Sequence, residues 1–408
     1  MQFTPIEEVI AEIAAGRVAI VVDDERRENE GDFICAAEKI TAETVNFMVT
    51  YGRGQFCVAI LPERAAELRL EPPVANTALM RTAYTMSVDL RTLKTGISAA
   101  ERAMTVRALA DPATRPDDLA RPGHVQPLVA QQGGVLRRAG HTEAAVDLAR
   151  LAGLKPAGAL IEILDVDGEV ARRTRLGEIA REHAIAITSV AEIIRYRRRH
   201  EKLVHRQASA NLPTRWGTFR LIGYAVDYEP TQPFALVLGD IERAEAPLVR
   251  MHSACFTGDV LESLRCDCGD QLRLALARIA GEGAGAVVYL PQEGRGIGLL
   301  EKIKAYQLQD EGVDTVEANL LLGFQADIRD YGIGIQILKD LGLRKVRLLT
   351  NNPKKLESFI YYGYDLEVVD QIELWAEPTP HRERYLRTKR ERLGHNLPGD
   401  PGASAKGE

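Results

Sequence analysis

The sequence predicts an α/β (α+β) protein of two domains. At 408 residues the chain is too long for one ordinary hydrophobic core, so two domains of roughly 200 residues are expected. Short apolar runs typical of buried strands alternate with amphipathic helical patterns in both halves. Between the halves, the stretch 195–219 begins with the basic run RYRRRH and loses apolar periodicity. We therefore expect a first domain over 1–199, a surface linker over 200–215, a second domain over 216–397 and a disordered tail over 398–408.

Composition and charge exclude several classes of protein. The apolar fraction of 45% and the charged fraction of 27% are ordinary for a globular protein, and no run of about 18 apolar residues is present to cross a membrane. The net charge of −6 argues against a nucleic-acid partner, so the basic run is interpreted as a solvated face. The N-terminus has acidic residues where a signal peptide needs basic ones, and the five cysteines suit a reducing compartment. We expect a cytoplasmic protein with small-molecule partners, no membrane and no nucleic acid.

In the first half, an apolar run over 18–24 predicts a buried strand that leads into an acidic loop. Glu28, Glu30 and Asp32 alternate in this loop, so an extended backbone places them on one side. Carboxylates gathered at a strand end suit Mg²⁺, which prefers oxygen ligands. A solvated charged loop without a metal is the alternative.

Further along, small and titratable side chains occur in turns. Thr95, Gly96 and Ser98 precede a helical pattern, where they either cap the helix or hold a phosphate. His124 and His141 each follow a glycine in a stretch without strong periodicity, which leaves them available for proton transfer or metal binding. Residues 159–171 predict a hairpin with Glu162 on its first strand.

Taken together, these motifs resemble 3,4-dihydroxy-2-butanone 4-phosphate synthase from about residue 5 to 198. They are RENEGD (27–32), TGISAAER (95–102), RPGH (121–124), RAGHTE (138–143) and PAG-x-x-x-E (156–162). The resemblance implies a three-layer α-β-α domain that converts ribulose 5-phosphate to a four-carbon phosphate and formate with Mg²⁺ or Mn²⁺, and that forms a homodimer. It implies that Glu28 and His141 bind the metal and that His124 and Glu162 are the acid/base pair. It implies that the turn over residues 138–142 holds the phosphate, and it assigns substrate contacts to Arg27, Glu28, Asp32, Arg138, Ala139, Gly140, His141, Thr142 and Glu162.

The second half is organised around a cluster of cysteines. Cys255, Cys266 and Cys268 follow the pattern C-x10-C-x-C, and a thiolate trio of this kind suits zinc. No fourth cysteine follows at C-x2-C spacing, and His252 on its predicted strand need not point at the same spot. Three ligands with one open position are the catalytic arrangement, in which the metal acidifies a water. Three reduced, buried cysteines that bind nothing are the alternative.

Two strand–turn–helix patterns in this half are candidate phosphate sites. The glycine-rich turn over 291–298 follows a buried strand, so its backbone N–H groups and Arg295 can meet phosphate oxygens. It matches neither the Walker A loop nor the dinucleotide fingerprint, so alone it is a weak signal. The stretch 346–357 repeats the pattern with Lys354 and Lys355 at a helix start, for which a simple capped turn is the alternative.

As a whole, the second half closely resembles GTP cyclohydrolase II over about 210–396. The motifs are RMHSACFTGD (250–259), SLRCDCGDQL (263–272), QEGRGIGL (292–299), DTVEAN (314–319), GFQADIRDYGIG (323–334) and LLTNNPKK (348–355). The resemblance implies a mixed α/β domain with zinc on the three cysteines, a zinc water that attacks guanine, and Mg²⁺ with the GTP triphosphate. It makes Asp327 the general base and Arg329 catalytic at the α-phosphate, although an arginine pKa above about 12 favours a charge-stabilising role. It assigns GTP contacts to Arg250, Met251, His252, Ser253, Ala254, Gln271, Glu293, Gly294, Arg295, Thr315, Thr350 and Lys355.

One position departs from that family's pattern, because Ala254 stands where a glutamate is common. The two resemblances together predict a bifunctional enzyme at the head of riboflavin biosynthesis, each half releasing formate. The alternatives are a chain with only the cyclohydrolase active, a zinc-stapled binding module, and a GTPase that uses the triphosphate chemistry alone.

Overall fold

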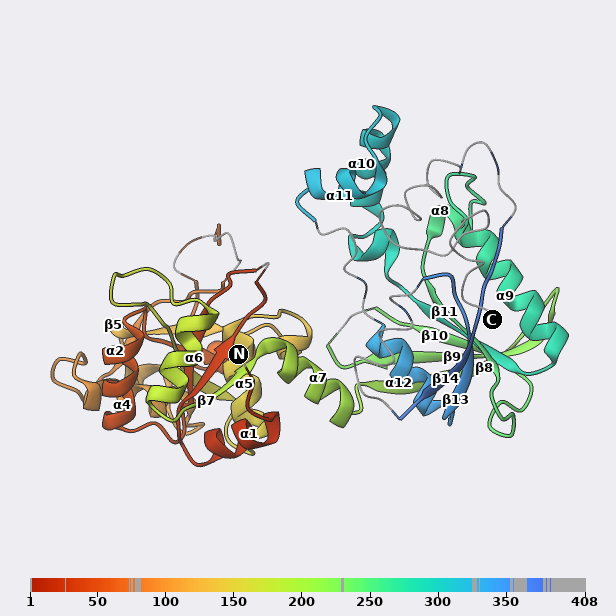
Figure 1. Cartoon of the computed structure of the whole chain (residues 1–408). Coiled ribbons are helices and arrows are strands. Elements are labelled where there is room, and N and C mark those ends of the chain that lie inside the picture. Colours follow the sequence, from red (N-terminus) through yellow and green to blue (C-terminus); the bar gives the residue numbers. More distant parts are fainter. Residues whose placement is uncertain are drawn as a thin grey trace. The chain divides into compact units, whose positions relative to one another are not determined.

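The computed structural model describes residues 2–25, 27–72, 74, 76–77, 82–228, 231–324, 329, 331–352, 355, 365–376, 379 and 382. The chain divides into two compact units, Met1–Arg197 and Arg198–Glu408 (Figure 1). Each unit contains a mixed sheet of seven strands. Within the described part of the chain, no helix combines the length and apolarity needed to cross a membrane.

In the first unit the strand order is β4-β5-β3-β6-β2-β1-β7. The pairs β1–β7 and β3–β5 are parallel and the other pairs are antiparallel. The strands are β1 (Ala19–Val22), β2 (Gly31–Ala36), β3 (Cys57–Ile60), β4 (Val88–Leu90), β5 (Leu119–Val129), β6 (Ala157–Glu162) and β7 (Ala186–Ser189).

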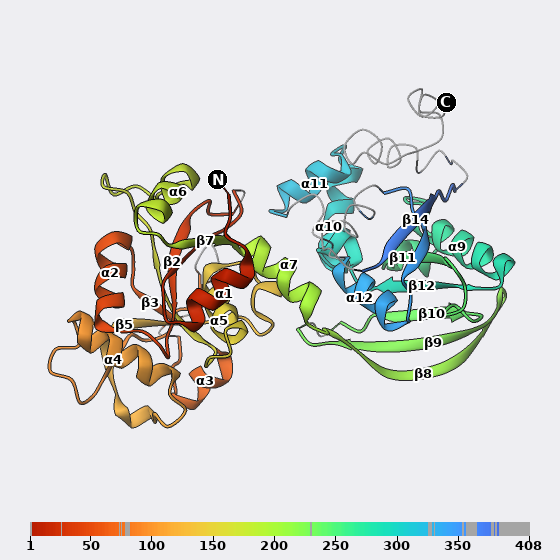
Figure 2. The same cartoon turned by 60° about the horizontal axis from the view of Figure 1, so that its bottom comes forward.

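Helices pack on both faces of this sheet (Figure 2). Side chains alternate along each strand, so Phe33 joins an apolar cluster with α2, α4 and α6, while its neighbour Ile34 joins a second cluster with α1, α5 and α7. Because both faces are covered, the strands read as continuous apolar runs. The helices are α1 (Ile6–Ala14), α2 (Ala42–Gly52), α3 (Pro62–Glu67), α4 (Ala99–Ala110), α5 (His141–Leu151), α6 (Arg173–Glu182) and α7 (Val190–His200).

In the second unit the strand order is β14-β13-β11-β12-β10-β9-β8, and Figure 2 shows β8, β9 and β10 side by side. An apolar cluster joins α9 to the sheet through Ile279, Leu248 and Val287. The strands are β8 (Val204–Thr214), β9 (Gly217–Val226), β10 (Phe234–Leu238), β11 (Leu248–Ser253), β12 (Gly285–Leu290), β13 (Lys345–Leu349) and β14 (Glu367–Ile372). The helices are α8 (Phe256–Asp259), α9 (Cys268–Glu282), α10 (Leu299–Asp310), α11 (Thr315–Leu321) and α12 (Gly332–Asp340).

The structure corrects the predicted linker over residues 200–215. Val204–Thr214 form β8, which pairs with β9 in an antiparallel ladder that is interrupted by one register shift between Arg206 and Ala208. β8 is at the end of the strand order and most of its residues are exposed, so it carries no apolar pattern that periodicity could detect. The predicted tail over 398–408 lies outside the described residues.

Candidate active sites

In the first unit, Asp23 at the end of β1 holds the acidic loop in shape. Its carboxylate accepts hydrogen bonds from the backbone N–H groups of Glu28 (3.0 Å) and Glu30 (2.9 Å). The guanidinium of Arg27 donates to the same carboxylate over 2.9 Å. Sequence reasoning did not single out Asp23, although its place directly after the buried strand was the available signal.

This loop brings predicted metal ligands together at the start of α5. His141 Nδ1 lies 3.7 Å from Asp32 Oδ1 and 4.0 Å from Glu28 Oε2. Asp23, Glu28 and His141 each offer one ligand atom, and these atoms lie within 4.8 Å of one another. In the described part of the chain, buried Asp32 Oδ1 and His141 Nε2 have no hydrogen-bond partner. Carboxylates and an imidazole with unsatisfied buried atoms fit a divalent cation.

The same cluster shifts the pKa values of its members. Burial lowers the pKa of His141 to about 4, so the imidazole is neutral and able to act as a ligand at neutral pH. Burial, together with the charges of Glu28 and Glu162, raises the pKa of Glu30 to about 7. Burial and the neighbouring carboxylates also raise the pKa of Asp32. Four acids held this close repel one another, and a cation would relieve that repulsion.

The predicted phosphate turn, residues 138–142, lies at the N-terminus of α5, where N–H groups of the first turn have no helical partner. Arg138 is fixed there, because its guanidinium donates to Glu143 over 2.6 Å and to Thr82 Oγ1 over 3.1 Å. Glu143 also accepts from the backbone of Gln131 over 3.0 Å.

The predicted acid/base pair, His124 and Glu162, lies at the same end of the neighbouring strands β5, β3 and β6. Asp32 and Glu162 face each other in the register of β2 and β6. Cys57 on β3 pairs with Gln126 on one side and Leu160 on the other. His124 is two residues before Gln126, and Glu162 is two residues after Leu160, so both lie level with one another on either side of β3. Two strand spacings place their backbones about 10 Å apart.

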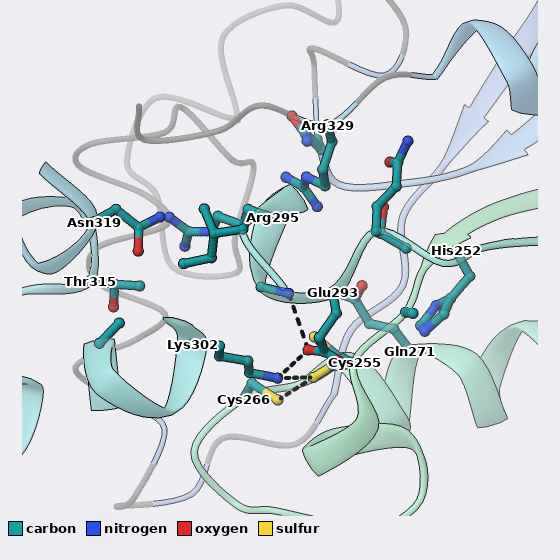
Figure 3. Close-up of a pocket in the computed structure, with 18 of the residues that line it drawn as sticks. His252, Cys255, Cys266, Gln271, Glu293, Arg295, Lys302, Thr315, Asn319 and Arg329 are labelled. Carbon is teal, nitrogen blue, oxygen red and sulfur yellow. Dashed lines mark hydrogen bonds and ion pairs between the residues drawn. The ribbon is translucent and has the colours of Figure 1, made fainter. Parts of the chain in front are cut away.

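In the second unit, a cavity that is open to solvent lies at the ends of β11 and β12, and Figure 3 shows many of the residues that line it. Most predicted GTP contacts line it: Arg250, His252, Ser253, Ala254, Gln271, Glu293, Gly294, Arg295, Thr315, Thr350 and Lys355, together with Arg329. Met251 differs, because alternation along β11 turns it to the opposite face, against Gly334 of α12. The predicted base Asp327 lies outside the described residues.

The three cysteines meet at the wall of this cavity. Cys255 Sγ and Cys266 Sγ are 3.6 Å apart, and all three sulfur atoms lie within 4.8 Å of one another. Zinc–sulfur bonds of about 2.3 Å at tetrahedral angles separate sulfurs by about 3.8 Å, so the trio fits zinc. Gly258 makes this approach possible, since a Cβ there would lie 2.9 Å from Cys266 Sγ and 3.2 Å from Cys255 Sγ.

His252 faces a carboxylate instead of the sulfurs. Its Nε2 lies 3.0 Å from both oxygens of Asp259. Asp259 also accepts from the backbone N–H of Cys255 over 3.0 Å and from the hydroxyl of Tyr289 over 2.9 Å. Asp259 therefore holds both the His252 ring at the end of β11 and the backbone of Cys255 in place. His252 does not join the three cysteines as a ligand, because its Nε2 is engaged by this carboxylate.

Lys302 on α10 is the main residue of this site that sequence reasoning missed. Its ammonium donates to Cys255 Sγ (3.2 Å) and Glu293 Oε1 (2.7 Å), as Figure 3 shows, and also to Thr257 Oγ1 (2.9 Å). Burial opposes its charge, but Cys255 and Glu293 outweigh burial and raise the pKa of Lys302. Hydrogen bonds with Cys266 and Cys268, and then the charge of Lys302, lower the pKa of Cys255. A single lysine within a helical stretch resembles any surface lysine in the sequence, so no pattern indicated that Lys302 belongs to the site.

Cationic and amide side chains also line the cavity. Buried Arg250 donates to Gln271 Oε1 over 2.6 Å and to the carbonyl of Leu349 over 2.9 Å. The ammonium of Lys355 donates to the carbonyl of Met251 over 2.6 Å. In the glycine-rich turn, Arg295 adopts a left-handed backbone with φ of 62°, a conformation uncommon for a side-chain-bearing residue and frequent at functional loops. The arrangement is suited to an anionic ligand.

Comparison with known families confirms both resemblances. The family model described as 3,4-dihydroxy-2-butanone 4-phosphate synthase matches residues 7–196, and the model described as GTP cyclohydrolase II matches residues 205–373. The chain is 54% identical over 396 residues to "Riboflavin biosynthesis protein RibBA" of Bacillus mycoides, covering 97% of this chain and 99% of the relative. It is 53% identical over 400 residues to the protein of that name in Parabacteroides distasonis, covering 97% and 98%.

A solved structure is also similar over most of the chain. It is RibBX from A. baumannii, described as a two-domain 3,4-dihydroxy-2-butanone 4-phosphate synthase, with 35% identity and a TM-score of 0.69. The similarity covers 90% of this chain and 100% of that one. The chain therefore belongs to the bifunctional riboflavin-biosynthesis family that joins a 3,4-dihydroxy-2-butanone 4-phosphate synthase to a GTP cyclohydrolase II.

Proposed function

We propose that the two units carry out two separate reactions that each release formate. The first unit converts ribulose 5-phosphate to 3,4-dihydroxy-2-butanone 4-phosphate. The second hydrolyses GTP to 2,5-diamino-6-ribosylamino-4(3H)-pyrimidinone 5′-phosphate, with release of pyrophosphate. The observation that carries the proposal is the cysteine trio beside a cavity lined by the residues expected to contact GTP.

In the first unit, Glu28 and His141 would hold Mg²⁺ or Mn²⁺, and their closeness to Asp23 and Asp32 supports this. When bound, the cation stabilises the enediolate oxygens that sugar-phosphate rearrangement requires. Arg27 and Asp32 bind the sugar, and residues 138–142 bind its phosphate at the N-terminus of α5. His124 and Glu162 exchange protons with adjacent carbons from the two sides of β3.

In the second unit, Cys255, Cys266 and Cys268 would hold zinc, which when bound supplies a water acidic enough to attack a carbon near neutral pH. The cavity-lining residues orient GTP over this position, and the guanidinium groups of Arg295 and Arg329 meet phosphate oxygens. Arg329 stabilises charge at the α-phosphate, Asp327 acts as the general base, and Mg²⁺ accompanies the triphosphate. Ala254 leaves room at the cavity wall where the family commonly has a longer acidic side chain.

The proposal includes a homodimer of the first unit and a cytoplasmic location. None of the five cysteines forms a disulfide, which suits a reducing compartment. Sedimentation of the purified chain measures the oligomeric state, and a monomer at assay concentration would exclude the dimer.

A chain with one active half is the second candidate. RibBX, which matches 90% of this chain, is described by the synthase activity alone. The thiolate trio and Lys302 are the features of this chain that favour cyclohydrolase activity as well.

Formate release tests the proposal directly. The purified full-length chain, supplied with zinc and Mg²⁺, receives GTP in one tube and ribulose 5-phosphate in another. Formate from both tubes is the expected result. Formate from one tube only would show a single active half, and no formate from either would overturn the proposal.

A further inference from the structure

Asp89 on β4 is joined to His124 by two hydrogen bonds. The backbone N–H of His124 donates to Asp89 Oδ1 over 3.0 Å, and His124 Nδ1 lies 2.6 Å from Asp89 Oδ2. The Asp89 side chain is 13% exposed, while the His124 ring is 44% exposed and so keeps its outer edge accessible. None of the sequence motifs includes Asp89.

Two motif glycines make room for this carboxylate. A Cβ on Gly96, in the TGIS motif, would overlap the carboxylate of Asp89. A Cβ on Gly123, in the RPGH motif, would overlap the backbone at Val88 and Asp89. Gly96 also has a φ of 76°, which favours glycine independently. Two separate motifs thus converge on one aspartate that neither contains.

The hydrogen-bond geometry fixes where the imidazole proton sits. One oxygen of Asp89 already accepts a backbone N–H, and an ionised carboxylate can only accept. The second oxygen, 2.6 Å from Nδ1, therefore accepts as well, so Nδ1 carries the proton. In the neutral ring Nε2 then carries the lone pair, which is the form of histidine that removes a proton from a substrate.

From this arrangement we propose that Asp89 is a positioning residue of the synthase reaction, which sets the tautomer and orientation of His124 without touching the substrate. The proposal rests on the role given to His124 under the proposed function. The same logic orients histidine bases by carboxylates in unrelated enzymes.

Asp89→Asn in the full-length chain tests it. The side-chain oxygen of asparagine can still accept the backbone N–H, but its NH₂ group then faces Nδ1 and moves the imidazole proton to Nε2. We expect kcat for formate release from ribulose 5-phosphate to fall by about 100-fold or more, the range of a lost general base. KM should change little, because Asp89 makes no substrate contact. Asp117→Asn, an exposed aspartate just before β5, is the matched control and should keep full activity.

GTP turnover by the same sample serves as an internal check on protein concentration and folding of the second unit. In a His124→Ala background, Asp89→Asn should cause no further loss, because it acts only through the ring. Additive losses in the double variant, or a rise in KM with kcat unchanged, would overturn the proposal and leave Asp89 a structural brace.

¹⁵N NMR of the histidine rings gives a readout that does not depend on activity. The chain has 8 histidines, and His124→Gln identifies the resonances of His124. The wild-type ring should show a protonated Nδ1 and a bare Nε2, and Asp89→Asn should reverse this. A wild-type ring protonated at Nε2 would overturn the proposal even if Asp89→Asn failed to fold. A wild-type chain without synthase activity would count against the proposed function alone, since the tautomer remains measurable.

Discussion

The ammonium of Lys302 lies 3.2 Å from Cys255 Sγ, so the predicted zinc site includes a fixed cation that is not a ligand. The same ammonium contacts Glu293, which also accepts the backbone N–H of Phe256 over 2.6 Å. A residue expected to contact GTP is thereby tied to a residue expected to bind zinc. Three thiolates around a divalent ion carry excess negative charge, and Lys302 offsets it within the cavity wall.

Replacing Lys302 with glutamine should lower kcat/KM for GTP by about 10- to 100-fold, the effect of a lost charge-assisted hydrogen bond. The measurement is steady-state GTP turnover, with synthase activity unchanged in the same preparation. Lys304→Gln is the matched control, because Lys304 lies on the same helix but is half exposed and pairs with Glu301. Equal effects of the two substitutions would contradict the role assigned to Lys302.

Replacing Cys266 with serine should remove both bound zinc and GTP turnover, because a hydroxyl is a poor ligand beside two thiolates. Zinc per chain is measured by elemental analysis, and formate is measured from each substrate. Formate from ribulose 5-phosphate should persist. Continued GTP consumption without zinc would favour a GTPase that uses the triphosphate chemistry alone.

Replacing His141 with alanine should abolish formate release from ribulose 5-phosphate and leave GTP turnover intact, since the buried imidazole next to Glu28 and Asp32 is the proposed ligand of the cation. Activities from both substrates, measured on one preparation, check this. Loss of both activities would instead point to global unfolding or to coupling between the units.

The raised pKa of Glu30, about 7, predicts a pH-dependent stability of the metal-free protein. Between the ordinary glutamate pKa near 4.5 and about 7, the folded state holds a proton that the unfolded state has lost, so stability falls as pH rises through this window. Glu30→Gln should therefore raise the melting temperature at pH 8 in a chelator and have little effect at pH 4.5. Added Mg²⁺ should reduce the difference at pH 8. An equal shift at both pH values would show that charge is not the cause.

Arg197 forms a buried ion pair with Asp147 at 2.8 Å and donates to the carbonyl of Gly133 over 2.7 Å. Arg197→Ala should destabilise the first unit by about 3 kcal/mol, because buried Asp147 loses its closest cation and is left with Arg150, at 3.7 Å, and the backbone N–H of Val135. Both tryptophans belong to the second unit, so their fluorescence serves as the control while loss of synthase activity in urea follows the first unit. Arg195→Ala, at a pair with Glu192 that is about one-third exposed, should have a smaller effect.

The sequence predicted the parts of each site that lie within a single motif. The cysteine pattern indicated a zinc site, and the alternation of Glu28, Glu30 and Asp32 indicated a cation site, since neighbours in sequence meet through local geometry. Lys302 and Asp89 could not be found this way. Lys302 meets Cys255 from 47 residues away, and Asp89 meets His124 from 35 residues away, through strand and helix packing.

The fold was predictable where residues are buried and not where they are exposed. Strands such as β1 and β12 are apolar along most of their length, because their side chains are buried on both faces of the sheet. β8 is held by backbone hydrogen bonds to β9 and is mostly exposed, so its side chains show no apolar pattern that would predict a strand. Met251 shows a third limit, because a motif gives a contiguous stretch of residues while a strand presents only every second one to a ligand.

The junction between the units has a consequence for dissecting the protein genetically. Arg197 is tied into the first unit, whereas the carbonyls of Arg198 and Glu201 each accept from Gln336 of α12 over 2.9 Å, and Leu203 N–H donates back to that side chain over 2.8 Å. One helix, α7, therefore supplies the last anchor of one enzyme and the first anchor of the next. A gene split at this point would therefore interrupt a helix that both units use. Two fragments that each keep all of these hydrogen bonds would both have to include residues of α7.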